Sequence, residues 1–231
     1  MKKITIAIDG FSSTGKSTLA KQLAKALGYV YVDTGAMYRA ITLFAMDKSF
    51  IGANSENRDG LVAELSNIQL RFVFNEDLGF SEMYLDGKNV EQEIRKMEVS
   101  QNVSRIAEIE QVRIKLVDLQ QKMGAAKGIV MDGRDIGTVV FPEAELKIFM
   151  TASPEKRAYR RYKELLDRGE KVSYEEVLEN VEKRDYIDSH REFSPLTKSP
   201  DAIEFDNSDM GLKEQFERMH NFALRVIEKK A

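Results

Sequence analysis

The stretch IDGFSSTGKST, residues 8–18, decides the fold of this 231-residue chain. A short apolar run that starts at Ile4 precedes it, and leucines four residues apart, Leu19, Leu23 and Leu27, follow it. A nearly continuous apolar run of strand length is typical of a strand buried on both faces, and the leucine spacing predicts a helix. A polar, glycine-containing loop therefore joins a buried strand to a helix, which is the opening of an α/β fold.

This loop has the spacing Gly10-x-x-x-x-Gly15-Lys16-Ser17 of a phosphate-binding loop. The backbone N–H groups of such a loop surround a phosphate chain, and the helix adds the positive end of its dipole. The lysine reaches the β- and γ-phosphates. A chance glycine-rich connector is the alternative, but the strand and helix on either side are the context that confirms the motif. The predicted phosphate-binding residues are Gly10, Phe11, Ser12, Ser13, Thr14, Gly15, Lys16, Ser17 and Thr18.

The same loop predicts a Mg²⁺ site, because the Ser17 hydroxyl of such a motif ligates the ion. Asp9, just before the loop, and Asp132, at the end of a later predicted strand, are candidates for holding the ion through water. Asp132 belongs to an Asp-Gly pair, so a simple turn is its alternative role. We predict Ser17 and Asp132 as the metal-binding residues.

Composition excludes several classes of protein. There is no cysteine, and His190 and His220 are far apart, so disulfides, thiolate metal sites and multi-histidine clusters are excluded. The net charge of −3 gives no general basic surface for nucleic acid, and no apolar run approaches the ~18 residues of a bilayer span. No heptad pattern or large apolar helix face is left over. We expect a cytoplasmic monomer that binds neither nucleic acid nor membrane.

Alternating strand and helix patterns later in the chain predict an α/β fold with a parallel sheet flanked by helices. Residues 68–90 differ: they read as two strands with a polar loop and a turn, which predicts a small antiparallel insertion outside the main sheet. The expected strands of the main sheet are residues 4–8, 29–33, 129–131, 146–150 and 202–205, with helices at 16–27 and 211–229.

Arginines gather where these strands end and on two later helices. DTGAMYR (33–39) and DGRDIGTVVFP (132–142) follow strands, while PEKRAYRRYKELLDRG (154–169) and KRDYIDSHREF (183–193) read as helical. A turn with a surface arginine, a solvated basic face and an exposed salt-bridged stripe are the alternatives for these segments. An enzyme that moves a phosphoryl group between two anions needs several cations around the reacting atoms, and this arrangement suits that task.

Taken together, GxxxxGKS, DTGAMYR, EIR (93–95), DGRDIGTVVFP, RAYRR (157–161) and KRDYIDSHREFSPL closely resemble the bacterial cytidylate kinase family, from residue 4 to the final strand. The resemblance implies transfer of a phosphoryl group from ATP, with Mg²⁺, to CMP or dCMP. It also implies one P-loop kinase domain, 1–231: a core of 1–34, 128–153 and 200–231, a monophosphate-binding region with the β insert at 35–127, and a helical lid at 154–172.

Site roles carry over to the matching positions. The resemblance implies that Lys16, Arg134, Arg157 and Arg161 are catalytic, the last two on the lid that closes over ATP. It implies that the monophosphate substrate is bound by Thr34, Arg39, Ser104, Arg113, Arg134, Asp135, Arg184, Asp188 and Arg191. Ser104, Arg113 and Asp135 match the cytosine pocket, and Arg184, Asp188 and Arg191 the ribose and phosphate contacts.

Two segments depart from the family pattern, the phosphate loop and the DTG triplet. Many members have Pro and Gly where this loop has Phe11 and Ser13, and Ser where Thr34 stands. Thr34 keeps the hydroxyl, so we expect little loss there. The loop keeps its anion cradle only if no residue other than glycine needs a positive φ.

Two other classes stay open on the residues alone. One is another small-molecule P-loop kinase, of the shikimate or adenylate type. The other is an NTP-dependent switch or nucleic-acid factor, but the chain has no N-K-x-D motif and no D-x-x-G turn followed by glutamine, and its arginines do not alternate with exposed aromatic residues.

Overall fold

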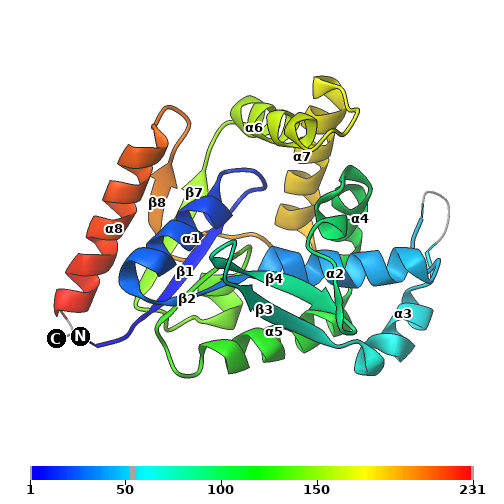
Figure 1. The fold of residues 1–231 in the computed structure, drawn as a ribbon, viewed down its shortest axis with the longest axis horizontal. Coiled ribbons are helices and arrows are strands. Elements are labelled where there is room, and N and C mark those ends of the chain that lie inside the picture. Colours follow the sequence, from blue (N-terminus) through cyan, green and yellow to red (C-terminus); the bar gives the residue numbers. More distant parts are fainter. Residues whose placement is uncertain (1, 53–55, 230–231) are drawn as a thin grey trace. The chain divides into compact units, whose positions relative to one another are not determined.

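The computed structural model describes residues 2–52 and 56–229, and the chain forms two compact units (Figure 1). Residues 1–33 and 120–231 make the first unit, and residues 34–119 make the second. Each unit has its own cluster of buried apolar side chains. The second unit is therefore an insertion into the chain of the first.

The first unit contains a five-stranded sheet in the order β2-β6-β1-β7-β8, and every neighbouring pair is parallel. All residues of β1 and β6 are buried, as their apolar runs predict for a sheet covered on both faces. The predicted parallel sheet is confirmed. Its strands are β1 Thr5–Gly10, β2 Val30–Asp33, β6 Ile129–Gly133, β7 Leu146–Thr151 and β8 Ile203–Asp206.

Helices α1 and α8 pack beside each other against this sheet (Figure 1). Helix α1 ends where Gly28 takes a φ of 65°, the left-handed conformation that ends many helices. Helices α6 and α7 pack on each other, and a capping box of Ser173 and Glu176 starts α7. The helices of this unit are α1 Lys16–Leu27, α6 Pro154–Asp167, α7 Tyr174–His190 and α8 Leu212–Lys229, with a π-helical turn at Ile136–Val140.

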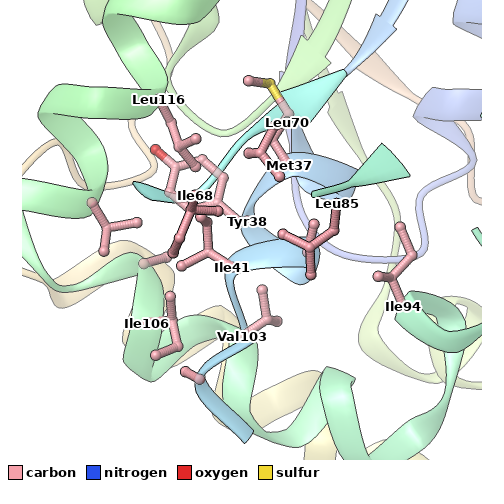
Figure 2. Close-up of a cluster of buried hydrophobic side chains, with 14 of the residues drawn as sticks. Met37, Tyr38, Ile41, Ile68, Leu70, Leu85, Ile94, Val103, Ile106 and Leu116 are labelled. Atoms are coloured by element: carbon pink, nitrogen blue, oxygen red, sulfur yellow. The ribbon is translucent and has the colours of Figure 1, made fainter. Parts of the chain in front are cut away.

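The second unit packs helices on a three-stranded antiparallel sheet in the order β3-β4-β5, which confirms the predicted insertion. Met37 and Ile41 of α2 lie in one buried cluster with Leu70 and Leu85 of the sheet (Figure 2). The elements are α2 Thr34–Asp47, α3 Arg58–Glu64, β3 Leu70–Asn75, β4 Phe80–Leu85, β5 Lys88–Asn89 and α4 Met97–Ala107, with single 3-10 turns at Leu65–Asn67 and Glu93–Arg95. Helix α5, Glu110–Gly124, runs from this unit into the first.

Within the described residues, 2–52 and 56–229, no helix has the length and apolar character needed to cross a bilayer.

Candidate active site

Two glycines give the phosphate loop its shape. Gly10 ends β1 with a φ of 142°, and a Cβ there would lie 2.1 Å from the carbonyl oxygen of Met150 on the neighbouring strand. Gly15 has a φ of 90° and precedes the first residue of α1. Residues with a Cβ rarely adopt these angles, and at Gly10 a side chain would also collide with β7. The glycines of the motif are therefore required by the backbone.

Ser13 also has a positive φ, of 59°. The condition that only glycines of the loop take such angles is thus not met. The left-handed conformation costs a residue with a Cβ about 1–2 kcal/mol, which the surrounding structure can carry at a single position. Ser13 holds a strained turn at the position where many family members have glycine.

Lys16 is buried inside the loop, with 5% of its surface exposed. Its Nζ donates to the carbonyl oxygen of Phe11 at 2.5 Å and to Oγ1 of Thr14 at 3.3 Å. Burial, together with the nearby Arg134 guanidinium, lowers the pKa of Lys16 to about 7. An anionic phosphate beside Lys16 would favour its charged form, so the ammonium is well placed to bind one.

An oxygen-rich site lies at the start of α1. Ser17 Oγ donates to one oxygen of Asp132 at 3.0 Å, and the Tyr31 hydroxyl donates to the other at 2.8 Å. Burial raises the pKa of Asp132 to about 6, and the nearby Asp33 acts in the same direction. A cation at this place would oppose that rise. The hard oxygen donors fit Mg²⁺ held by one or two protein groups, water and phosphate.

No group of three or more His, Cys, Asp or Glu side chains that could hold a metal occurs in the part of the chain that the structure describes. Mg²⁺ commonly keeps several waters and binds with substrate phosphates, so this finding agrees with the smaller set of Ser17 and Asp132.

The carboxylate of Asp9, just before the phosphate loop, binds two backbone amides. One carboxylate oxygen accepts from the N–H of Ile136 at 2.8 Å, and the other accepts from the N–H of Gly137 at 2.7 Å. Burial raises the pKa of Asp9 to about 7, although these two bonds act against the rise. Both oxygens of Asp9 therefore bind the backbone, and the role of Asp9 in holding Mg²⁺ through water stays a prediction.

Asp188 on α7 joins several of the predicted arginines. It accepts from Arg134 Nε at 2.8 Å, and its other oxygen lies 3.8 Å from Arg191 Nη1. Burial alone would raise the pKa of Asp188, but Arg134, Arg184 and Arg191 together hold it below the usual value of 3.8. Asp188 and Arg191 are 4% and 6% exposed, so the alternative of an exposed salt-bridged stripe is wrong for them. Arg191 follows the last residue of α7 rather than lying on the helix.

Arg157 connects α6 to the phosphate loop. Its Nη1 donates to the carbonyl oxygen of Ser12 at 3.3 Å, and its guanidinium lies 5.2 Å from the centre of the Phe11 ring. Nη2 donates to Asp185 on α7 at 2.6 Å. Arg157 is 2% exposed, which excludes a solvated basic face for this residue.

Phe11 therefore has a role of its own at the second position of the loop. Its ring lies edge-on to Phe149 of β7, with 6.1 Å between ring centres, and beneath Arg157.

Arg161, the second predicted lid arginine, pairs with Glu164 on α6 at 3.0 Å. A catalytic role for Arg161 stays a prediction.

A second set of bonds to the phosphate loop, from Asn207 and Arg160, was not predicted from the sequence. Asn207, 1% exposed and directly after β8, donates through Nδ2 to the carbonyl oxygen of Thr14 at 2.7 Å. Arg160 donates to the same carbonyl at 3.2 Å and to the carbonyl of Asn207 at 2.9 Å. The position of Asn207 at the carboxyl end of a parallel strand was a usable signal, because ligands of such sheets bind at that edge.

Four of the other predicted substrate residues belong to the second unit: Thr34 and Arg39 on α2, Ser104 on α4 and Arg113 on α5. Asp135, which belongs to the first unit, is buried directly before the turn at Ile136–Val140. Arg113 is 3% exposed, donates to the carbonyl of Ala107 at 3.1 Å and lies over the Tyr38 ring. Ser104 is also buried. The part of these residues in binding the substrate stays a prediction.

Comparison with known proteins gives a consistent result. A model of the cytidylate kinase family matches residues 6–225. The chain is 68% identical over 216 residues to a protein named cytidylate kinase from Flavobacterium johnsoniae, covering 94% of each chain. It is 54% identical over 228 residues to a cytidylate kinase from Bacteroides thetaiotaomicron, covering 99% of this chain and 100% of the relative. With nearly the whole chain matched, and with the phosphate loop in place between β1 and α1, the chain belongs to the cytidylate kinase family.

Proposed function

We propose that this protein transfers the γ-phosphoryl group of ATP to CMP or dCMP, which gives ADP and CDP or dCDP. The observation that carries the proposal is the gathering of cations at the phosphate loop. Lys16 lies inside the loop, Arg134 and Arg184 are near enough to act on its pKa, and Arg157 contacts the loop at Ser12. Charge develops over the transferred oxygens during phosphoryl transfer, and positioned cations stabilise it.

Each group has a proposed task in an in-line transfer. The loop and the start of α1 bind the ATP phosphates, and Lys16 leaves its bonds to Phe11 and Thr14 to reach the β- and γ-phosphates. Arg134 acts between donor and acceptor, while Arg157 and Arg161 cover ATP and exclude water. A phosphate acceptor needs no strong general base, and catalysis then depends on positioning and electrostatics.

We propose Ser17 and Asp132 as the protein groups that hold Mg²⁺. When bound, the ion neutralises charge on the phosphates. The side-chain oxygens of Ser17 and Asp132 already lie 3.0 Å apart at the start of α1, and they match the ligands that the ion prefers.

The absence of cysteine from the sequence supports a cytoplasmic setting, and we propose that the enzyme works there as a monomer.

The choice of base is proposed to lie with Asp135, Arg113 and Ser104. Cytosine has an exocyclic amino donor beside ring acceptors, whereas uracil has an oxygen in place of that amino group. A carboxylate accepts from the amino group, and arginine donates to ring acceptors. Asp135 is 3% exposed, so an acceptor lacking the amino group would leave a buried partner without its bond.

The proposal is tested by coupled measurement of ADP release with ATP and Mg²⁺ against CMP, dCMP, UMP, AMP and shikimate, with an acceptor-free reaction as the control. We expect CMP or dCMP to give the highest kcat/KM, and the acceptor-free rate to be far lower. A preference for AMP or shikimate would replace the proposal by another small-molecule kinase activity. ADP release that no acceptor stimulates would point to a hydrolytic switch.

A further inference from the structure

Asp9 connects the start of the phosphate loop to the segment that carries residues proposed for the acceptor. It is the residue before Gly10, where the loop begins, and its carboxylate binds the amides of Ile136 and Gly137. We propose that Asp9 is a positioning residue: it fixes the turn that carries Arg134 and Asp135 at a set place beside the phosphate loop. The acceptor side of this inference rests on the proposed function.

The turn at Ile136–Val140 needs partners for its first amides, as every helical turn does. Asp135 is the residue before it, and aspartate is a favoured side chain for bonding such amides. Asp135 nevertheless makes no side-chain capping bond to the turn. Asp9, 127 residues earlier in the chain, bonds the amide of Ile136 instead. The Asp9 carboxylate on β1 thus accepts the bond that the side chain of the residue before a helical turn usually accepts.

The glycine at position 137 also fits this arrangement. A Cβ on Gly137 would lie 3.3 Å from Oδ2 of Asp9 and 3.2 Å from the side chain of Lys147. These distances are tighter than ordinary side-chain contacts, so a side chain there would press on the Asp9 carboxylate. The glycine lets the amide of residue 137 approach Asp9 to 2.7 Å.

Two attachments to β1 stand on either side of Arg134 and Asp135. Before them, Gly133 of β6 lies opposite Asp9 in the parallel ladder. After them, Ile136 and Gly137 bind the side chain of the same Asp9. The two residues between these attachments cannot move along the sheet without breaking one of them. A small misplacement of reacting groups lowers transfer rates strongly, which gives this double attachment a functional consequence.

The test compares Asp9→Asn with the wild-type enzyme. Asparagine keeps one acceptor, but its NH₂ group faces an amide N–H in place of the second, so one buried bond is lost. We expect KM for CMP to rise about tenfold, the factor of roughly one lost buried hydrogen bond, while KM for ATP changes by less than about threefold. Amide hydrogen exchange at Ile136 and Gly137 should become faster. Asp209→Asn, with an 88% exposed side chain, is the matched control and should change none of these values.

Gly137→Ala disturbs the same contact without replacing Asp9, and it decides the matter if Asp9→Asn does not fold. In the Gly137→Ala enzyme too, KM for CMP should rise more than KM for ATP. Equal increases in both KM values, a lower melting temperature with both KM values unchanged, or unaltered exchange at residues 136 and 137 would each overturn the inference. If the wild type proves to use no pyrimidine monophosphate, the proposed function fails by itself, and the exchange measurement still reports on the contact between Asp9 and the turn.

Discussion

Asp9, Lys16 and Asp132 are among the titratable side chains of the site that the fold has removed from water. Each is at most 6% exposed. Burial raises the pKa of the two carboxyl groups, to about 7 and about 6, and lowers that of the lysine to about 7. Groups shifted in this way are common where binding or catalysis takes place, because a low-dielectric setting strengthens every interaction with a charged ligand.

The loop lysine should dominate transition-state stabilisation. Lys16→Ala is expected to lower kcat by a factor of ~10² or more, because one positioned cation near the transferred phosphoryl group is lost. Steady-state kinetics with ATP and CMP measures the effect, and circular dichroism checks that the fold is intact. Lys25→Ala, at an exposed position of the same helix, serves as the control. Near-normal turnover of a folded Lys16→Ala enzyme would contradict the proposed role of the loop.

The base preference should depend on the buried carboxylate of Asp135. Asp135→Ala is expected to reduce kcat/KM for CMP by roughly 1–3 kcal/mol in free-energy terms, the size of an unmade buried hydrogen bond. UMP has no amino donor for this carboxylate, so its kcat/KM should fall much less and the CMP:UMP ratio should collapse. The alternative, a structural pairing of Asp135 with a neighbouring arginine, predicts an equal fall for both substrates. Arg134 is the neighbouring arginine in question, and in the structure its Nε donates to Asp188.

Among the secondary-structure elements, α6 and α7 determine where the arginines lie. Helix α6 starts with Ser153 as its cap and Pro154 in the first turn, and its buried side chains include Ala158 and Leu165. Arg157 ties this helix to α7 through Asp185 and to the phosphate loop through Ser12. Two helices from late in the chain therefore bring their charges to a loop near its start.

We expect residues 154–172 to behave as a lid. Most side chains after Leu165 in this segment are exposed, so few apolar contacts hold residues 166–172 in one place. Hydrogen exchange across residues 154–172 should slow when ATP and CMP, or a bisubstrate analogue, are bound, because closure excludes water from the reaction. Helix α8 serves as an internal reference and should not change. Exchange that stays the same across the segment would argue against a lid.

The ion-pair group around Asp188 gives a prediction about stability and pH. Asp188→Asn leaves the arginines beside it without their buried counter-charge, and unfolding free energy at pH 7 should fall by about 3 kcal/mol. The folded pKa of Asp188 is depressed, so its contribution is present above the unfolded value and is lost as the pH falls through the folded one. The difference between variant and wild type should therefore narrow below about pH 4.

Urea unfolding at pH 7, 5, 4 and 3 measures this difference. Asp167→Asn, at the exposed end of α6, is the control and should follow the wild type at each pH. A gap between Asp188→Asn and the wild type that stays constant down to pH 3 would show that the Asp188 charge does not stabilise the folded state.

The whole molecule consists of a parallel α/β unit and an inserted unit with its own core, one supplying the phosphate loop and the other carrying Ser104 and Arg113. Among the described residues, exposed large apolar side chains lie on separate elements, such as Ile114 on α5, Tyr159 on α6 and Leu212 on α8, and Val73, Phe74 and Leu78 form the one run of them close together in the chain. Scattered exposed apolar residues of this kind do not build an interface.

We therefore expect a monomer in solution. Sedimentation equilibrium across micromolar concentrations should give the mass of one 231-residue chain, with or without nucleotides. Apolar patches large enough for stable association would make the apparent mass rise with concentration. Such a rise would contradict the expectation.

The sequence alone determined the features that depend on neighbouring residues. The strand at Thr5–Gly10, the loop glycines and the helix at Lys16–Leu27 follow from local apolar periodicity and from backbone angles that only certain residues accept. The antiparallel insertion was readable for the same reason, because alternation and turn residues are local signals. The family resemblance then supplied the expected site residues, since its motifs are contiguous in the chain.

Only the tertiary structure decided which side chains meet. The bonds from Asn207 to the Thr14 carbonyl and from Asp9 to Ile136 join residues more than a hundred positions apart, and no spacing rule applies to such pairs. Their partners depend on strand order and register, which place the carboxyl ends of β1, β6 and β8 at one edge of the sheet. Asp9 shows the difference best: its place before the loop made it a candidate for holding Mg²⁺ through water, while the parallel pairing of β1 with β6 puts the amides of the following turn within reach of its carboxylate, and those amides bind both of its oxygens.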